Sequence, residues 1–298
     1  MNPVALRVRR ARLSVIGPRA TALVGAALVI VGILGLTSRD TSSKSSPAPA
    51  SPTPALTVPA GFTAVTRDGA LYAGGNYARP LGPAISPGTP VIGAATAAAG
   101  GVWMARGDGS VVAEGAVPTL ESAQLSPRAA PVVGIAAAAR GTGYRLVTAD
   151  GHVFSIGAVS RGQDTAHRHA APVVGIASGV GDGYWIAHSD GTVTAFGERS
   201  FRTTPLPLGT YVAGIASAPS GRGFWLVDSD GAVRAVGVPS YGDLRGRLGP
   251  TRVAAITAAP GRGYWITTTD GAVHGFGVPG VAAPSNPPSA GIAAVVES

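Results

Sequence analysis

The chain of 298 residues contains no cysteine, a single lysine and few charges, since Asp, Glu, Lys and Arg together make up 13% of it. The absence of cysteine excludes disulfides, thiolate metal sites and a cysteine nucleophile. Aromatic residues are also scarce, at 6%, but a hydrophobic fraction of 45% is too high for a chain that is disordered throughout. Glycine and proline are abundant instead, with 44 and 25 copies.

Most of the net charge of +8 lies near the N-terminus. Residues 1–44 hold six Arg, Lys44 and Asp40, a net charge of +6, which leaves +2 for the remaining 254 residues. A protein that binds nucleic acid needs a clustered basic surface to neutralise phosphates. The nearly neutral body therefore predicts that nucleic acid is not a partner.

An uncharged stretch of 17 residues, 20–36, follows the first five arginines. As a helix it would reach about 25 Å, which is at the short end of the range that crosses a bilayer. The positive-inside bias then leaves residues 1–19 in the cytoplasm and exports the rest. The sequence predicts a signal-anchor helix at 20–36, and this helix makes the membrane a partner of the protein.

A cleaved signal peptide is the alternative, and it would make the protein secreted. Such peptides have an apolar core of about 7–15 residues with a small-x-small site close behind it. Here the core is longer, and Ala48-Pro49-Ala50 lies 14 residues beyond Leu36, which favours the uncleaved anchor. Residues 37–58 are rich in Ser, Thr and Pro, and they predict an extended linker before a folded domain at 59–298.

The folded domain has a period of about 40 residues. Asp-Gly recurs six times at spacings of 40, 42, 40, 40 and 40, with one Gly seven residues before each Asp and another seven residues after it. A period of this length indicates a propeller or a solenoid. We assign a structural role in turns to the six aspartates, which are Asp68, Asp108, Asp150, Asp190, Asp230 and Asp270.

Each repeat predicts at least three antiparallel strands, with a fourth in the variable stretch left open. Residues 172–197 show the pattern best: a Val-Val-Gly-Ile-Ala run, a Gly-rich turn, then Gly-Tyr-Trp-Ile, and Asp-Gly before Val-Thr-Ala-Phe-Gly. Asp-Gly between such runs is typical of a two-residue hairpin loop. That loop would pair Trp185 with Phe196 and Ala187 with Thr194. The same register would pair Trp225 with Val236 and Trp265 with Phe276.

The two ends of the domain complete one another. The first repeat begins at Gly61-Phe62 without its first strand, and residues 290–296 supply that strand with no hairpin after it. In a closed ring the last strand pairs into the first blade and removes the free sheet edges. The sequence therefore predicts an all-β, six-bladed β-propeller that is closed by its C-terminal strand and preceded by one transmembrane helix.

Residues 183–197, Gly-Tyr-Trp-Ile-Ala-His-Ser-Asp-Gly-Thr-Val-Thr-Ala-Phe-Gly, resemble repeats of exported proteins from high-GC bacteria. They are also similar to the repeats of the regulator-of-chromosome-condensation propellers, and the likeness extends over residues 61–298. Phe, Ile or Val stands here where those repeats have Trp before the closing Gly, and their His before the second strand is missing. The resemblance implies a propeller of Asp-Gly hairpins, but no particular partner, because members of that fold bind unrelated targets.

Motifs that carry catalysis are absent from the sequence. It has no Gly-x-Ser-x-Gly elbow, no phosphate-binding loop and no dinucleotide fingerprint. We therefore assign no catalytic residue and no cofactor. His167 and His169 could chelate a metal from a strand, but no third ligand is evident and Arg168 repels a cation, so we predict no metal site.

Three arginines recur in the Gly-rich turns that join the first and second strands of the repeats. Arg140, Arg222 and Arg262 stand in these turns, with Asp182 among them. Equivalent turns of a propeller lie on one face of the ring, so these four residues form our candidate site for an anionic ligand or an acidic partner surface. The alternative is that the arginines only keep the surface soluble.

The sequence thus favours a membrane-anchored, extracytoplasmic propeller that recognises a protein or a cell-envelope polymer without catalysis. The alternative is an extracytoplasmic hydrolase or lyase with its site at the central channel. Convergent polar side chains with perturbed pKa values at one channel mouth would favour the enzyme. A channel lined by Val, Ala and Gly would favour the recognition module.

Overall fold

The computed structural model describes residues 61–298 except 75–80, 82–87, 119, 124, 127–128, 166–170, 281–287 and 298. The predicted basic segment, transmembrane helix and linker, at 1–19, 20–36 and 37–58, lie outside the described residues. Within the described part of the chain, no helix has the length and apolar character needed to span a membrane.

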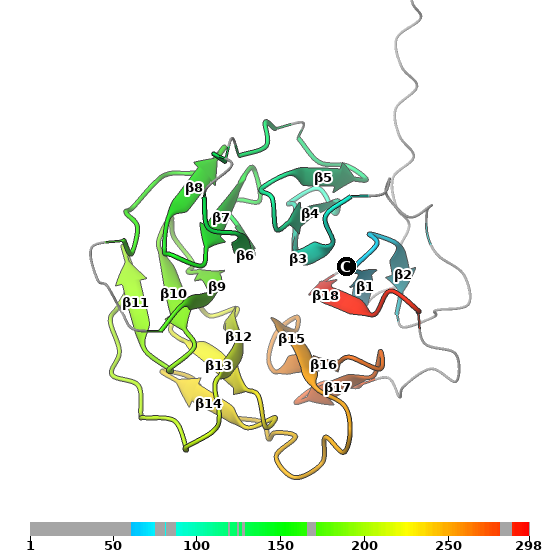
Figure 1. Ribbon diagram of the computed structural model, residues 1–298, viewed down its shortest axis with the longest axis vertical. Helices are drawn as coiled ribbons and strands as arrows, with labels where there is room; N and C mark the ends of the chain where they lie inside the picture. The colour runs from blue at the N-terminus through cyan, green and yellow to red at the C-terminus, as the bar shows by residue number, and fades with distance from the viewer. Residues whose placement is uncertain are drawn as a thin grey trace, which may run out of the picture. The chain divides into compact units, whose positions relative to one another are not determined.

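The described residues form six antiparallel sheets of three strands each, which follow one another around a ring (Figure 1). We call each sheet a blade and name its strands inner, middle and outer, from the ring axis outward. The inner strands are β3 (Val91–Thr96), β6 (Val132–Ala137), β9 (Val173–Ser178), β12 (Val212–Ser217), β15 (Val253–Ala258) and β18 (Ile292–Glu297). The middle strands are β1 (Phe62–Thr66), β4 (Val102–Arg106), β7 (Tyr144–Thr148), β10 (Tyr184–His188), β13 (Phe224–Asp228) and β16 (Tyr264–Thr268). The outer strands are β2 (Leu71–Ala73), β5 (Val111–Glu114), β8 (Val153–Ile156), β11 (Val193–Phe196), β14 (Val233–Val236) and β17 (Val273–Phe276).

The ring is closed by the C-terminal strand, as the sequence predicted. Strand β18 pairs with β1 antiparallel, with Ala64 opposite Val295 and Val65 opposite Ala294. The first blade therefore has the order β18-β1-β2, whereas the other five blades are each built from consecutive strands. The inner strands contact their neighbours in one closed circuit, from β18 through β3, β6, β9, β12 and β15 back to β18. This closure confirms the six-bladed arrangement.

The loops of the Asp-Gly hairpins are one residue longer than predicted. The His188 N–H donates to the Thr192 carbonyl, and the Gly191 N–H donates to the His188 carbonyl. The loop therefore has three residues and ends on Gly191 at a φ of 90°, which matches the three-residue hairpin closed by a glycine bulge.

The longer loop shifts the pairing of the middle and outer strands. Phe196 lies opposite Tyr184, and Ala195 lies opposite Trp185. The predicted pairs Trp185–Phe196 and Ala187–Thr194 were therefore wrong. The same shift corrects Trp225–Val236 to Phe224–Val236 and Trp265–Phe276 to Tyr264–Phe276.

A glycine at the third position of four inner strands allows the blades to converge on the axis. A Cβ added to Gly175 would lie 3.1 Å from Cγ2 of Ile215 in the next blade. A Cβ added to Gly214 would lie 3.3 Å from Cγ2 of Ile256. Gly93, Gly175 and Gly214 each leave room for an isoleucine of the following blade. The fourth glycine, Gly134, lies close to the backbone of Gly175 and Ile176 in the following blade.

Aromatic side chains join neighbouring blades farther from the axis. The Trp at the second position of a middle strand packs on the aromatic ring that begins the next middle strand. Trp225 lies 5.0 Å from Tyr264 between ring centroids, and Trp265 lies 5.3 Å from Phe62. The second of these contacts crosses the junction between the last blade and the first, so side chains as well as backbone pairing close the ring. Two further pairs of this type are Trp103–Tyr144 and Trp185–Phe224.

Arg145 occupies the Trp position in the third blade and is fully buried. The Trp185, Trp225 and Trp265 indole N–H groups each donate to the carbonyl 14 residues later. The Arg145 guanidinium donates to the equivalent carbonyl, that of Val159, with Nη2 at 3.0 Å. Its Cζ also lies 5.0 Å from the centre of the Tyr184 ring. Arg145 therefore reproduces both contacts of the Trp it replaces.

Candidate binding site at the central channel

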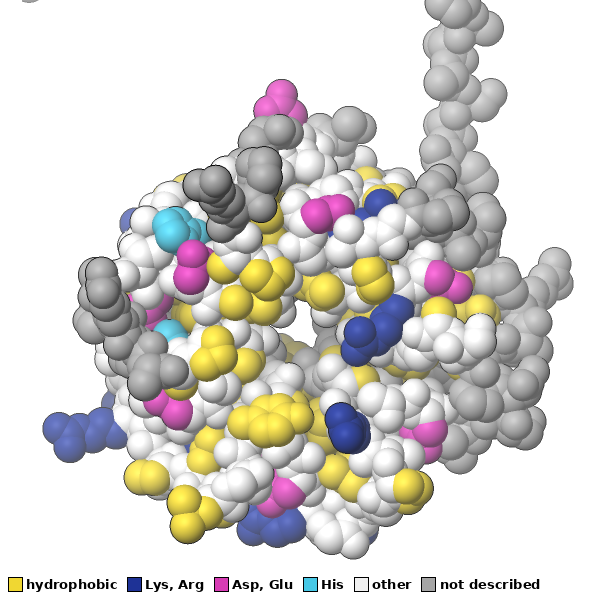
Figure 2. All heavy atoms as spheres, viewed as in Figure 1, with side chains coloured by type: hydrophobic (Ala, Val, Ile, Leu, Met, Phe, Trp, Pro, Cys, Tyr) yellow, Lys and Arg dark blue, Asp and Glu magenta, His cyan; other side chains and the backbone are white. Residues whose placement is uncertain are grey.

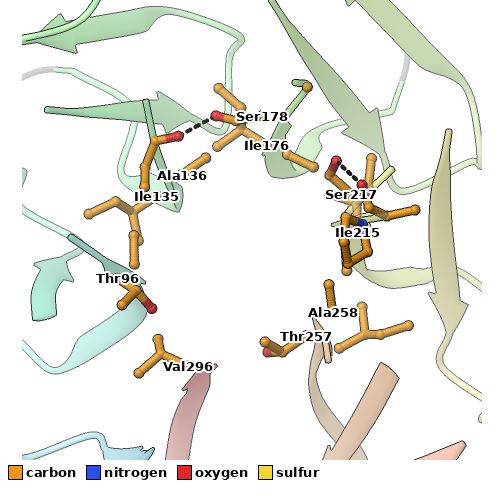
Figure 3. Close-up of a pocket in the computed structure, with 18 of the residues that line it drawn as sticks. Thr96, Ile135, Ala136, Ile176, Ser178, Ile215, Ser217, Thr257, Ala258 and Val296 are labelled. Carbon is orange, nitrogen blue, oxygen red and sulfur yellow. Dashed lines mark hydrogen bonds between the residues drawn. The ribbon is translucent and has the colours of Figure 1, made fainter. Parts of the chain in front are cut away.

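The inner strands surround a channel that opens at the centre of the ring (Figure 2). A cavity of about 520 Å³ lies where these strands end, and all six inner strands contribute to its wall (Figure 3). A second cavity of about 140 Å³ shares Ile135, Ile176, Ile215 and Ile256 with the first. Among the described residues that line the two cavities, none has an ionisable side chain.

Two hydroxyl groups of the channel wall join adjacent blades. Ser178 Oγ donates to the carbonyl of Ala137 in the preceding blade at 2.6 Å (Figure 3). Thr257 Oγ1 donates to the carbonyl of Val295 in the following blade at 2.7 Å. Each of these two hydroxyl groups donates its proton to a backbone carbonyl. They therefore hold the blades together and are not arranged for proton transfer.

The two faces of the ring carry different loops. On one face, which we call the hairpin face, the Asp-Gly hairpins join middle to outer strands. Acidic side chains are spread around this face at some distance from the channel opening, and basic side chains lie nearer to the opening (Figure 2). Each described turn is held by its own aspartate: Asp190 Oδ1, for example, accepts from the Thr192 N–H at 2.9 Å and from its hydroxyl at 2.7 Å.

Some hairpin aspartates also accept from a threonine that ends the middle strand. Thr148 Oγ1 donates to Asp150 Oδ1, and Thr268 Oγ1 donates to Asp270 Oδ1, both at 2.5 Å. The hydrogen bond from Thr148 is the main cause that holds the pKa of Asp150 below its ordinary value. These hydrogen bonds give Asp150 and Asp270 a structural role in their turns.

On the opposite face, which we call the turn face, turns join inner to middle strands. Because the strands are antiparallel, these turns lie at the other end of the blades from the hairpins. Ala139, Val180 and Pro219 come from these turns and line the larger cavity. Neighbouring turns also touch, since the Ala98 N–H donates to the Gly141 carbonyl at 3.2 Å. The turns of the third, fourth and fifth blades therefore form part of the rim of the larger cavity.

The four residues that the sequence singled out stand in the turns of this face, and none of them is among the residues that line the larger cavity. Arg140, Arg222 and Arg262 are exposed, and Asp182 is partly exposed. Asp182 Oδ2 lies 3.8 Å from Nη2 of Arg161, an arginine that follows the third outer strand and that the sequence did not single out. The structure therefore brings the predicted residues to one face and gives the acidic member a basic neighbour.

Two buried pairs of polar side chains were missed by sequence analysis. His188 Nε2 lies 2.8 Å from Asp164 Oδ2, and both side chains are almost fully buried. Asp228 is also buried and lies 3.0 Å from Nη2 of Arg234. Burial raises the pKa of Asp228 and outweighs the opposing effect of Arg234. Asp164 is 24 residues from His188, so no local pattern indicates that pair.

Both pairs lie at the end of a middle strand, where Thr148 and Thr268 stand in other blades. Asp164 is also bound by its backbone, because its N–H donates to the carbonyl of Gly151 at 2.9 Å. The pair therefore ties the segment after the third blade to the middle strand of the fourth. Neither pair lines the channel cavities, and we assign both to structure.

A metal site is not indicated in the described part of the chain, which contains no group of three or more His, Asp or Glu side chains suited to hold an ion. The His167 and His169 pair considered above lies outside the described residues.

No protein-family model matches the chain, and no curated protein matches it. Among solved structures, the β-propeller domain of Cps50 (Swd1) from Myceliophteria thermophila is similar, with a TM-score of 0.50 and 11% identity. The match covers 76% of this chain and 84% of that one. A structure of U3-55K matches with a TM-score of 0.45 and 14% identity, over 71% of this chain and 72% of that one. At this identity the first likeness concerns the fold alone, and it agrees with the closed ring of blades: the described domain is a β-propeller.

Proposed function

We propose that this protein is a non-catalytic recognition or scaffold module, anchored in the membrane by residues 20–36 and displayed outside the cytoplasm. The observation that carries the proposal is the chemistry of the channel. In an enzyme the central channel would supply convergent ionisable groups, whereas the described lining here consists of Ala, Gly, Ile, Val, Pro, Ser and Thr. Outside the channel, exposed turns carry charged side chains such as Arg140, Arg222 and Arg262.

The geometry of the wall also supports binding over catalysis. The hydroxyl protons of Ser178 and Thr257 are directed to backbone carbonyls, so neither group has a base positioned to activate it. The turn face, by contrast, presents exposed arginines in the turns of three separate blades. A partner that contacts this face would touch several blades at once, as a scaffold requires.

The location can be tested with single-cysteine variants, because the natural chain has no cysteine. Leu208 is fully exposed on the loop before β12, so Leu208→Cys introduces one accessible thiol. In intact bacterial cells, a membrane-impermeant maleimide should label full-length Leu208→Cys but not Ser14→Cys. Ser14→Cys should be labelled only after lysis. Labelling of neither position until lysis would place both segments inside the cell and contradict the proposed export.

The recognition function can be tested by photo-cross-linking in the same cells. Val180 is 64% exposed on the turn face, so a photoreactive residue there should give discrete adducts with a partner. The same residue at Leu208 is the comparison position. Absence of adducts at every tested loop position would count against a recognition module. Release of a product from envelope material by the purified chain, lost when Ser217→Phe fills the channel, would instead favour the hydrolase or lyase.

A further inference from the structure

The turn face combines an apolar cavity with a basic rim. The cavity of about 520 Å³ falls in the range of about 300–1,000 Å³ that is typical of ligand pockets. Ile135, Ile176 and Ile215 contribute to its wall, and Val180 adds an exposed apolar side chain at the mouth. A ligand that fits this site needs at least one apolar group that can enter the cavity.

The rim adds a requirement for negative charge. Among the described residues, no acidic side chain lies within ion-pair distance of Arg140, Arg222 or Arg262. Two described acids oppose this charge: Asp182, which has Arg161 beside it at 3.8 Å, and Glu198, whose carboxylate lies against Gly179 of the cavity wall. Farther out, where outer strands end on this face, Glu114 carries negative charge and Arg199 carries positive charge. The described residues of the turn face still have an excess of positive charge, which carboxylates of a partner would neutralise.

The backbone of the inner strands indicates what kind of ligand carries the apolar group and the negative charge. Each inner strand is an edge strand that pairs only with its middle strand, so its other edge faces the channel. Neighbouring blades already use some backbone groups of these edges, such as the carbonyls of Ala137 and Val295, and the others are directed toward the channel. A hydrocarbon chain offers no partner to these groups, whereas a peptide carries donors and acceptors along its length. The combination of edge strands, apolar side chains and arginines therefore matches a peptide better than a lipid.

We infer that the turn face binds an acidic peptide segment of a partner protein. Its carboxylates pair with Arg140, Arg222 and Arg262, and one apolar side chain enters the cavity. This inference rests on the proposed recognition function and names the chemistry of the partner at that same site.

The experiment measures binding of a fluorescent peptide, Asp-Asp-Leu-Leu-Asp-Asp with blocked ends, to the full-length chain in neutral detergent. The triple variant Arg140→Ala, Arg222→Ala, Arg262→Ala should bind the peptide about tenfold or more weakly, because three exposed charge pairs of modest strength are lost. A matched triple variant on the hairpin face, with the same change in net charge, should bind as the natural chain does. It consists of Arg67→Ala, Arg245→Ala and Arg252→Ala.

Peptide variants separate the two parts of the site. Replacing the Asp residues of the peptide by Asn should abolish binding at low salt, and replacing Leu by Ser should weaken it. Ser217→Phe, which fills the cavity from its wall, should remove the difference between the Leu and Ser peptides while the dependence on salt remains. Circular dichroism of each variant verifies that the sheets are intact.

Several results would overturn the inference. These are equal affinity in the two triple variants, equal affinity for the Asp and Asn peptides, or no binding of any peptide. Binding of anionic phosphatidylglycerol vesicles, but not of the peptide, would assign the rim to a lipid and would also overturn it. If discrete adducts still form from position 180 in cells, the recognition function stands and only the acidic-peptide chemistry fails.

Discussion

Arg145 offers the sharpest test of how the blades are held together. Its guanidinium donates to the carbonyls of Val159 and Asp182 at 3.0 and 2.9 Å and lies over the Tyr184 ring. Hydrogen bonds from a charged donor contribute about 1.5–3 kcal/mol each. Burial of the charge opposes this gain, as the lowered pKa of Arg145 indicates, since its largest cause is desolvation.

Two substitutions at this position should have different effects. Arg145→Ala leaves two carbonyls without their donor and opens a cavity, so it should lower the free energy of unfolding by about 3–5 kcal/mol. Arg145→Trp restores the residue found in four other blades, with an indole N–H able to reach the Val159 carbonyl and a ring able to pack on Tyr184. It buries no charge, so its stability should lie within about 1 kcal/mol of the natural chain.

The reverse replacement, Trp225→Arg, serves as the control. The carboxylate of Asp182 favours the charge of Arg145, but the equivalent turn next to Trp225 carries Arg262 instead. An arginine buried there would lack this favourable neighbour, so Trp225→Arg should destabilise the fold by several kcal/mol, about as much as an unpaired buried charge. Urea unfolding followed by circular dichroism measures all three variants. If Arg145→Trp is as unstable as Arg145→Ala, the equivalence of the Arg and Trp contacts is refuted.

Two further predictions concern the axis and the hairpins. Gly175→Val should lower the free energy of unfolding by about 1–3 kcal/mol, because a Cβ added to Gly175 would lie only 3.1 Å from Cγ2 of Ile215. Gly181→Val is the control, since the space around Gly181 is open. Equal melting temperatures of the two variants would contradict the close approach of the blades. Hydrogen bonding by Thr148 lowers the pKa of Asp150, so Asp150 contributes stability above its unfolded pKa of about 4, and this contribution is lost as the pH falls through the folded value. The difference in melting temperature between the natural chain and Asp150→Asn should therefore be constant at neutral pH and shrink below about pH 4. A difference that does not depend on pH would show that folding does not stabilise the carboxylate of Asp150.

The sheets and the closure could be predicted because they follow from a period and from the two ends of the domain. The missing strand before Phe62 and the extra strand at 290–296 fit each other regardless of side-chain detail. The pairing register could not be obtained in this way. It depends on whether Ser189 belongs to the strand or to the loop, and Asp-Gly is compatible with loops of two or three residues.

In the candidate site, too, some features could be predicted from the sequence and others could not. The common face of Arg140, Arg222 and Arg262 follows from topology, because equivalent turns of a propeller lie at the same end of the blades. The Asp164–His188 pair and the carbonyl partners of Arg145 connect segments that are 14 to 37 residues apart, and nothing in the local sequence marks them. Contacts of this kind depend on how the loops cross the blade edges, which only the folded structure shows.

Closure of the ring is most directly tested by a disulfide engineered between β1 and β18. Ala64 and Val295 are register partners, and the Cα atoms of such partners in antiparallel strands lie about 4.5–5.5 Å apart, within the range a disulfide spans. The natural chain has no cysteine to interfere. When Ala64→Cys, Val295→Cys is refolded in an oxidising buffer, peptide mapping should find a bond within the chain between positions 64 and 295, and the melting temperature should rise. Free thiols, or bonds only between separate molecules, would contradict the closed ring.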